Sequence, residues 1–317
     1  MKQKTLFSLL FIITIVLLTP PLANAEGQSL SIFPPVINID TTPPSSPTVP
    51  IVIQNDQEED VNLKIELIPF KTNDKNGDII FLPDQINKGF YPYYRDRIQF
   101  LVDDKKTDFI SLKPLESKEV TLNVNLTKGD PPGDYYYTIV FLSGANGPAD
   151  TSIARLPAGI GTNLILSVGP KEKSSGGISE FTTSSFKKNG PVEFNLKLHN
   201  ASKHVILPSG TIEIKNMFGK KVGLVNLLPQ YVIAGSDRYL LDEKSQPDSA
   251  DENPKVIWRE KFLLGFYTAN ATIQLDENSQ VLTATTYFFA FPVMLFIPLS
   301  VGLFVAISIY LRVRRKL

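Results

Sequence analysis

The residue types that could do chemistry are scarce, and the two histidines are the first to consider. His199 and His204 flank the short turn Asn200-Ala-Ser-Lys203. Facing one another across a hairpin, they could take a metal together with a nearby acid, but a zinc site needs three or four protein ligands and no third is in view. We therefore interpret the segment as a polar turn, and predict no metal and no other cofactor.

The segment Asn73-Asp-Lys-Asn-Gly77-Asp78 has the oxygen-rich composition of a calcium loop. Aligning Gly77 with the glycine that such a loop requires places Thr72 and Pro83 where an acid and a bidentate glutamate are needed. Asn-Gly is instead a strong signal for a tight hairpin with positive φ. A hairpin turn is the better interpretation.

Signatures of catalysis are also missing from the sequence. It contains no Gly-x-Ser-x-Gly elbow and no glycine-rich phosphate loop. The acid pair Asp103-Asp104 is adjacent, and neighbouring residues of a strand point to opposite faces, so a solvated turn fits it better than an acid and base pair. We predict no catalytic residue and a protein that is not an enzyme.

The most unusual surface feature is the run Phe90-Tyr-Pro-Tyr-Tyr-Arg-Asp-Arg97, which we expect in a loop between strands. Aromatic faces and guanidinium groups suit sugar rings, carboxylates and protein hot spots. The candidate ligand-contact residues are Tyr91, Tyr93, Tyr94, Arg95 and Arg97. The alternative is that these rings cover the end of a β-sandwich, and both interpretations stay open.

The two ends of the chain predict export and anchoring. Lys2 and Lys4 precede a short apolar run and the small-residue stretch Ala23-Asn24-Ala25, which is the order of a cleaved signal peptide over residues 1–25. Residues 287–311 are free of charge and long enough to span a bilayer. Residues 312–317 form a basic tail that is expected to stay in the cytoplasm, which places residues 26–286 outside the cell.

Charge and cysteine content narrow the class of protein further. Without the basic residues of the two ends, 26 basic and 32 acidic residues remain, a net charge of about −6. Nucleic-acid binding is not expected, because its affinity comes largely from Lys and Arg. Disulfides cannot reinforce the domains, because the chain has no cysteine, and this favours an exported protein of a bacterium or an archaeon.

Between the ends, short alternating apolar runs are separated by Pro, Gly, Asn and Asp, which predicts half-buried strands and turns. We expect an all-β fold of two tandem immunoglobulin-like antiparallel β-sandwiches, over residues 26–170 and 178–286, plus one C-terminal transmembrane helix. Residues 171–177 are charged and then rich in Ser and Gly, so they are expected to form a linker that allows relative domain motion.

The two sandwiches resemble diverged copies of each other. In each, an apolar strand ends in an asparagine, Asn55 in the first and Asn200 in the second. In each, a glycine precedes a late strand that carries a tyrosine two residues on, Tyr135 and Tyr267. These tyrosines are candidates for tyrosine corners, in which the hydroxyl bonds to nearby backbone in a structural role.

This order of features resembles the bacterial WxL-interacting-protein family. The resemblance is carried by the following segments: Phe33-Pro-Pro35, Thr72-Asn-Asp-Lys-Asn-Gly-Asp78, Leu112-Lys-Pro-Leu-Glu-Ser-Lys-Glu-Val-Thr-Leu122 and Gly133-Asp-Tyr-Tyr-Tyr-Thr-Ile-Val-Phe141. It implies a first domain similar to the family's peptidoglycan-binding module and a second similar to its partner-binding or host-binding module.

The leading hypothesis is a non-enzymatic adhesion protein, anchored in the cell membrane by a single span, whose sandwiches bind cell-wall polymer such as peptidoglycan or another surface protein. The alternative is a structural scaffold or assembly factor of an extracytoplasmic complex, which binds its partner chain through exposed strand edges. Capture of a partner chain without any polymer would favour the alternative.

Overall fold

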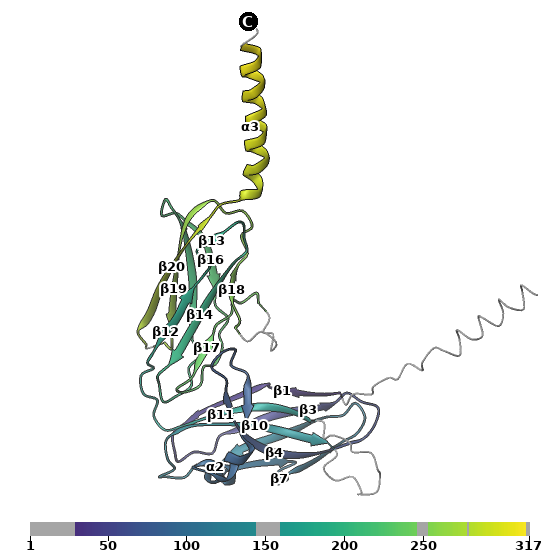
Figure 1. Ribbon diagram of the computed structural model, residues 1–317. Coiled ribbons are helices and arrows are strands. Elements are labelled where there is room, and N and C mark those ends of the chain that lie inside the picture. Colours follow the sequence, from purple (N-terminus) through teal and green to yellow (C-terminus); the bar gives the residue numbers. More distant parts are fainter. Residues whose placement is uncertain (1–28, 144–158, 246–252, 278, 315–317) are drawn as a thin grey trace, which may run out of the picture.

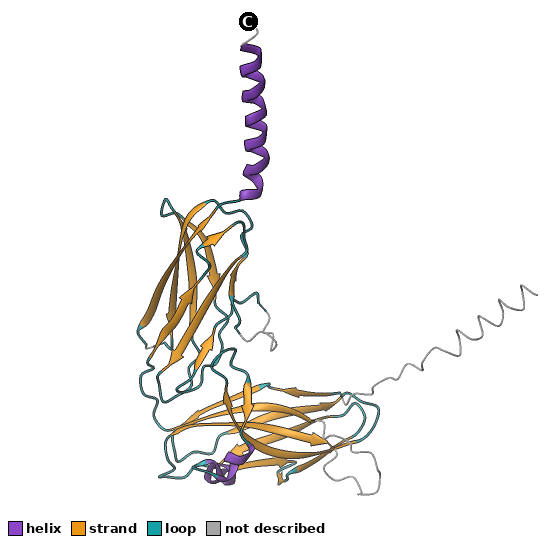
Figure 2. Ribbon diagram, viewed as in Figure 1, coloured by secondary structure: helices purple, strands orange, loops and turns teal. Residues whose placement is uncertain are grey.

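The computed structural model describes residues 29–143, 159–245, 253–277 and 279–314, and it shows an all-β chain of two β-sandwiches followed by one helix (Figures 1 and 2). The predicted signal peptide lies outside the described residues. The predicted all-β sandwich architecture is confirmed.

The first sandwich packs two sheets face to face. One sheet has the order β1 (Leu30–Phe33), β3 (Thr48–Asn55), β9 (Ser117–Val124), β6 (Ile98–Val102) and β7 (Lys105–Lys106). The other has the order β2 (Val36–Thr41), β11 (Gly159–Val168), β10 (Gly133–Ser143), β4 (Val61–Thr72) and β5 (Ile79–Phe81), and β8 (Phe109–Leu112) also pairs with β4. The 3₁₀ helix η1 (Pro83–Asn87) and the helix α2 (Tyr91–Arg97) connect β5 to β6.

The second sandwich repeats this design. One sheet has the order β12 (Gly176–Thr182), β14 (Val192–Asn200) and β17 (Asp237–Tyr239), and β18 (Val256–Trp258) also pairs with β14. The other has the order β13 (Phe186–Lys187), β20 (Val281–Ala290), β19 (Gly265–Gln274), β15 (Ser209–Asn216) and β16 (Lys221–Asn226).

Alternation along the strands fills both cores. On β9 and just beyond it, Val120, Leu122, Val124 and Leu126 are all buried, as the period of two predicts. On β14 the alternate residues from Val192 to Leu198 are buried in the same way.

The helix α3 (Val293–Arg314) projects from the end of the second sandwich (Figure 1). The expected start of this helix at Tyr287 is wrong, because β20 continues to Ala290 through its pairing with β19. The basic residues Arg312 and Arg314 are the last turn of α3 rather than a separate tail. Among the residues that the structure describes, no helix is both long enough and apolar enough to cross a membrane.

The internal repeat is confirmed by what the two asparagines do. The Asn55 amide donates to the carbonyls of Glu59, at 2.7 Å, and Lys113, at 2.9 Å. The Asn200 amide donates to the carbonyls of His204 and Val232, both at 2.9 Å. Each asparagine is fully buried and ties the strand that it ends to a second segment of its own sandwich.

A hydroxyl–backbone bond of the kind expected at a tyrosine corner occurs at one of the two predicted positions, Tyr267. The Tyr267 hydroxyl accepts the N–H of Leu264 at 3.0 Å and donates to the carbonyl of the same residue at 3.3 Å. In the first sandwich the backbone bond belongs to Tyr137, whose hydroxyl donates to the carbonyl of Tyr91 at 3.0 Å. The Tyr135 ring instead packs against the ring of Tyr94, with the two ring centroids 3.9 Å apart.

Two predicted turns are also confirmed. Gly77, at φ +79°, lies in the antiparallel β4–β5 hairpin, where the Asn73 side chain accepts its N–H at 3.0 Å. Asp103 and Asp104 form the exposed β6–β7 turn, with φ of 51° and 61°.

Candidate binding site at the domain junction

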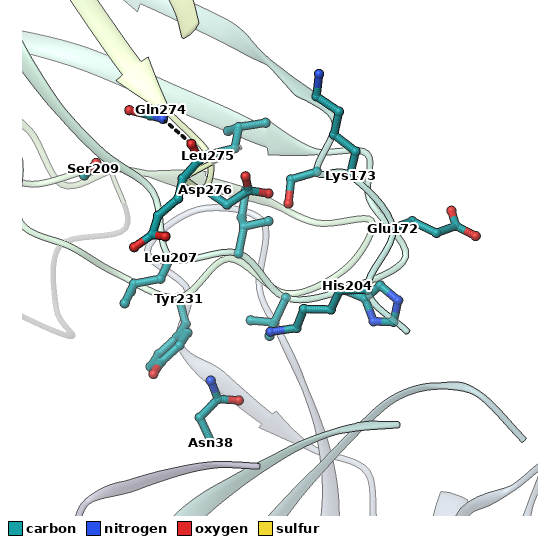
Figure 3. A pocket seen from close by; sticks show the side chains of 15 residues that line it. Asn38, Glu172, Lys173, His204, Leu207, Ser209, Tyr231, Gln274, Leu275 and Asp276 are labelled. Carbon is teal, nitrogen blue, oxygen red and sulfur yellow. Dashed lines mark hydrogen bonds between the residues drawn. The ribbon is translucent and has the colours of Figure 1, made fainter. Parts of the chain in front are cut away.

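A cavity of about 880 Å³ lies where the two sandwiches meet (Figure 3). Its walls come from β2, from the segment between β11 and β12, from the β14–β15 loop, from Tyr231 and from the β19–β20 turn. The segment expected to be a free linker therefore forms a wall of this cavity, and its last two residues, Gly176 and Gly177, begin β12.

Charges of both signs surround the cavity, together with apolar side chains. Lys171 pairs with Asp40 of β2 at 2.5 Å, and Lys203 pairs with Glu172 at 2.9 Å. The hydrogen bond and charge of the Lys203 ammonium hold the pKa of Glu172 below its ordinary value. The lining also includes acidic and apolar side chains: Asp276, Glu277, Ile206, Leu207 and Leu275. No single sign of charge dominates, which suits a polypeptide better than a polyanion.

A buried pair from the two sandwiches lies beside this cavity. The Nδ1 atom of His204 is 2.8 Å from Oδ1 of Asp134, and Asp134 is the second residue of β10. The other oxygen of Asp134 accepts the N–H of Val205 and, at 3.1 Å, the hydroxyl of Tyr136. That hydroxyl in turn accepts the N–H of Ala234 at 3.1 Å. Burial raises the pKa of Tyr136, so the phenol stays neutral and donates.

Apolar packing joins the sandwiches next to this network. Phe70, Tyr136 and Ile165 from the first sandwich form one buried cluster with Val205 and Ile233 from the second. The linker was expected to allow relative domain motion, and in the structure this shared core joins the two sandwiches at the junction.

The β4–β5 hairpin adds a second contact between the sandwiches. The carbonyl of Lys75 accepts the N–H of Tyr239 at 2.7 Å. A Cβ atom on Gly77 would lie 2.5 Å from Cζ of Arg238, so the hairpin tip lies directly on this guanidinium. The Arg238 side chain donates to the carbonyl of Tyr231 at 2.8 Å.

The strand β2 offers an open edge at the cavity. It ends its sheet, and its only strand partner among the described residues is β11. The carbonyls of Pro35 and Thr41 accept the N–H groups of Asn163 and Gly169, within and just after β11. The backbone groups of the odd-numbered residues of β2 therefore point toward β11. Because backbone groups alternate along a strand, those of Asn38 and Asp40 face outward. Both side chains are exposed, and Asn38 lines the cavity.

The sequence-predicted contact residues lie elsewhere, on α2, on the side of the first sandwich that faces away from the second (Figure 1). The segment is helical rather than a loop. Tyr94 is fully buried, its hydroxyl donates to the carbonyl of Pro131, and burial raises its pKa. Tyr91 is half-buried and packs edge-on against Tyr137 at 5.4 Å. Neither ring is displayed on the surface.

The other three candidates face outward more. The Tyr93 hydroxyl donates to Asp130, and Nη2 of Arg97 donates to that hydroxyl at 2.7 Å. Burial opposes ionisation of Asp130, but hydrogen bonds from Tyr93 and Thr127 outweigh it, so the pKa of Asp130 is lowered. Arg95 extends into solvent and bonds to Asn87 at 3.3 Å. Much of α2 thus covers the sandwich end, and ligand binding there stays a prediction.

The two histidines do not meet at a metal site. His199 pairs with Asp237 at 2.9 Å, while His204 pairs with Asp134. Within the described ranges, no three metal-binding side chains come together. The junction site was not predicted from the sequence. A signal for it existed, because the alternation of Ile37 and Ile39 with Asn38 and Asp40 is the pattern of a half-exposed strand.

No family model matches the chain, and no curated protein matches it. Among solved structures it is similar to the class 5 fimbriae chaperone CfaA, with a TM-score of 0.38 and 10% identity over 82% of this chain and 99% of that one. It is also similar to the E. coli chaperone DraB, with a TM-score of 0.36 and 13% identity over 81% of this chain and 98% of that one. It is similar as well to the Salmonella enterica complex of the SafA pilin with the SafB chaperone, with a TM-score of 0.34 and 11% identity over 82% of this chain and 98% of that one.

Proposed function

We propose that this chain is a non-enzymatic scaffold or assembly factor, which holds an extended segment of a partner protein against the outer edge of β2. The observation that carries the proposal is the outward-facing backbone of Asn38 and Asp40, beside a cavity of about 880 Å³. An open strand edge binds a partner strand through main-chain hydrogen bonds, and an adjacent cavity takes alternate side chains of that strand.

Two other edges of the first sandwich, at β7 and β5, are less suited to this role. The edge strand β7 consists of Lys105–Lys106 alone, and short charged edges discourage pairing. The edge strand β5 has three residues and runs directly into η1. By contrast, β2 has six residues and lies next to an apolar and mixed-charge cavity.

The packed junction supports the proposal because it fixes the two sides of the cavity before binding. Ordering flexible domains costs free energy when a ligand binds, and a preformed site avoids that cost. The shared cluster of Phe70, Tyr136, Ile165, Val205 and Ile233 provides this rigidity.

The proposed setting is extracytoplasmic, with immunoglobulin-like sandwiches held at the membrane through the segment that contains α3. The signal-like residues 1–25 and the uncharged residues 291–311, which follow β20, support this setting. Cell fractionation with external protease tests it: digestion of the sandwiches in intact cells is expected, and full protection would contradict it.

Polymer binding of the kind implied by the resemblance to WxL-interacting proteins is the competing prediction. The surface of α2 that carries Tyr93 and Arg95 is its candidate location. Co-sedimentation of the chain with cell-wall sacculi tests it, and loss of sedimentation on Arg95→Ala with an unchanged fold would favour an adhesin.

Site-specific photo-crosslinking in cells tests the main proposal. A photoreactive residue at Lys173, in the wall of the cavity, should give a discrete adduct with a partner polypeptide. The same residue at Lys106, on the edge strand β7 of the other sheet, is the matched control and should give none. Adducts from Lys106 alone, or from neither position in a chain that sediments with sacculi, would overturn the proposal.

A further inference from the structure

Large apolar side chains are exposed at the end of the second sandwich from which α3 leaves. We call them the collar: Phe186, Met217, Phe218, Phe262, Leu264 and Phe266. Phe218 is 85% exposed and Phe266 is 62% exposed, far more than a core side chain. Contiguous apolar patches on a soluble surface mark interaction sites.

Strand pairing brings the collar residues to the same end of the sandwich. Phe266 pairs with Phe289 of β20, and Phe186 of β13 pairs with the same residue from the other side. A Cβ atom on Gly265 would lie 2.8 Å from Cε of Met217, which places the β15–β16 turn against the start of β19. Only three residues separate Phe289 from Val293, the first residue of α3.

The collar is not an extension of the core of the second sandwich. On β19, Gly265 and Tyr267 are buried, while Phe266 between them points outward. Phe218 lies in a tight turn before Gly219, which has φ +75°, and such turns ordinarily carry polar residues. Burial inside this domain therefore does not explain either aromatic ring.

Basic residues rim the collar. Three exposed lysines lie within two residues of a collar residue in the sequence: Lys188, Lys220 and Lys261. The one acidic residue in these short segments is Glu260. The helix that leaves this end exposes further apolar side chains, including Met294 at 82% and Phe304 at 72%. Aromatic and apolar side chains with lysines around them are the composition that suits a membrane–water interface with anionic lipids.

We propose that the collar rests in the headgroup region of a phospholipid bilayer that contains anionic lipids, with the lysines on lipid phosphates. The second sandwich would then stand on the membrane by its α3 end instead of swinging freely on the helix, with the domain junction held away from the surface. This inference rests on the proposed membrane setting and is independent of partner binding.

The absence of cysteine allows a single label at any chosen position. Phe218→Cys and Phe262→Cys, each carrying a nitrobenzoxadiazole fluorophore, are reconstituted as full chains into vesicles of phosphatidylcholine and phosphatidylglycerol. Gln280→Cys is the matched control, because it lies in the turn at the opposite end of β19, about 30 Å away at the rise of a β-strand. Lipids with a headgroup-proximal nitroxide should quench the collar labels several-fold more than the control label.

Equal quenching of all three labels by aqueous iodide, with none by the lipid nitroxide, would overturn the proposal. Collar labels shielded from both quenchers would do so as well, since a protein would then cover the collar. A chain that does not float with vesicles contradicts it too. Changing Lys188, Lys220 and Lys261 together to glutamate should reduce lipid quenching in anionic vesicles, with a much smaller effect in neutral ones.

Discussion

The imidazole of His204 and the carboxylate of Asp134 meet at 2.8 Å although they belong to different sandwiches. Their side chains are 9% and 1% exposed. Around them, the N–H of Val205 and the hydroxyl of Tyr136 both donate to the same carboxylate. These buried bonds join the two sandwiches at the junction. The cavity next to β2, whose walls come from both sandwiches, is therefore formed without a partner.

His204→Ala should lower the free energy of unfolding by about 1–3 kcal/mol, because it removes a buried partner of a carboxylate. His199→Ala is the matched control, since His199 also pairs with an aspartate but is 44% exposed, and it should cost less than about 1 kcal/mol. Urea denaturation of both variants provides the measurement. Equal costs would show that the junction pair contributes no more than a surface pair.

Gly77→Ala should destabilise the chain by at least about 1 kcal/mol more than Gly129→Ala. Both glycines have positive φ, +79° and +97°, so both substitutions carry the strain of that conformation. Only at Gly77 would the new Cβ meet Arg238, while nothing lies within 4 Å at Gly129. Thermal unfolding compares the variants, and equal shifts in Tm would mean that the hairpin tip is free of the second sandwich.

Asn55→Ala and Asn200→Ala should each lower stability by about 1–3 kcal/mol, since each removes a fully buried amide that donates to two backbone carbonyls. Asn125→Ala, at a half-buried position that bonds to the Ser46 hydroxyl, is the control and should cost less. Denaturant unfolding gives all three values. A negligible effect at one asparagine would contradict the equivalence of the two sandwiches.

Stability should fall with acid partly through Asp242, which is 2% exposed. Burial alone would raise the pKa of Asp242, but hydrogen bonds from Ser245, Arg259 and two backbone N–H groups outweigh it, so the pKa lies below the ordinary value of 3.8. A depressed folded-state pKa contributes stability above about pH 4 that is lost as pH falls through that lower pKa.

Asp242→Asn should therefore reduce stability at pH 7 and flatten the loss in acid. Unfolding at a series of pH values from 7 to 2 measures both effects. An unchanged acid limb in the variant would show that other carboxylates carry the pH dependence.

Strand faces and the internal repeat were predictable because they depend on neighbours along the chain. The alternation around Val120 and Leu122 needs no knowledge of the rest of the fold. The helix α2 was missed, since seven residues make no stable helix alone and tertiary contacts hold this one. The Tyr91 ring of α2 packs against Tyr135 and Tyr137, which follow some forty residues later in the chain.

The strand β12 was partly hidden in the expected linker for a similar reason. A Cβ atom on Gly176 would lie 2.3 Å from the carbonyl oxygen of His199, so glycine here marks close strand approach as well as flexibility. The junction was out of reach because Asp134 and His204 are 70 residues apart and nothing local connects them. Neither residue alone differs from an ordinary polar residue near a turn.

The most direct test of partner capture compares Asn38→Pro with Asn38→Ala, each with the photo-crosslinker at Lys173. Proline removes the outward N–H of Asn38 without breaking a bond to β11, and edge strands tolerate it, whereas alanine removes only the side chain. The account predicts that Asn38→Pro loses most of the crosslinked partner while Asn38→Ala and the unmodified chain retain it, with all three equally folded. Full crosslinking by a folded Asn38→Pro chain would contradict strand capture at β2.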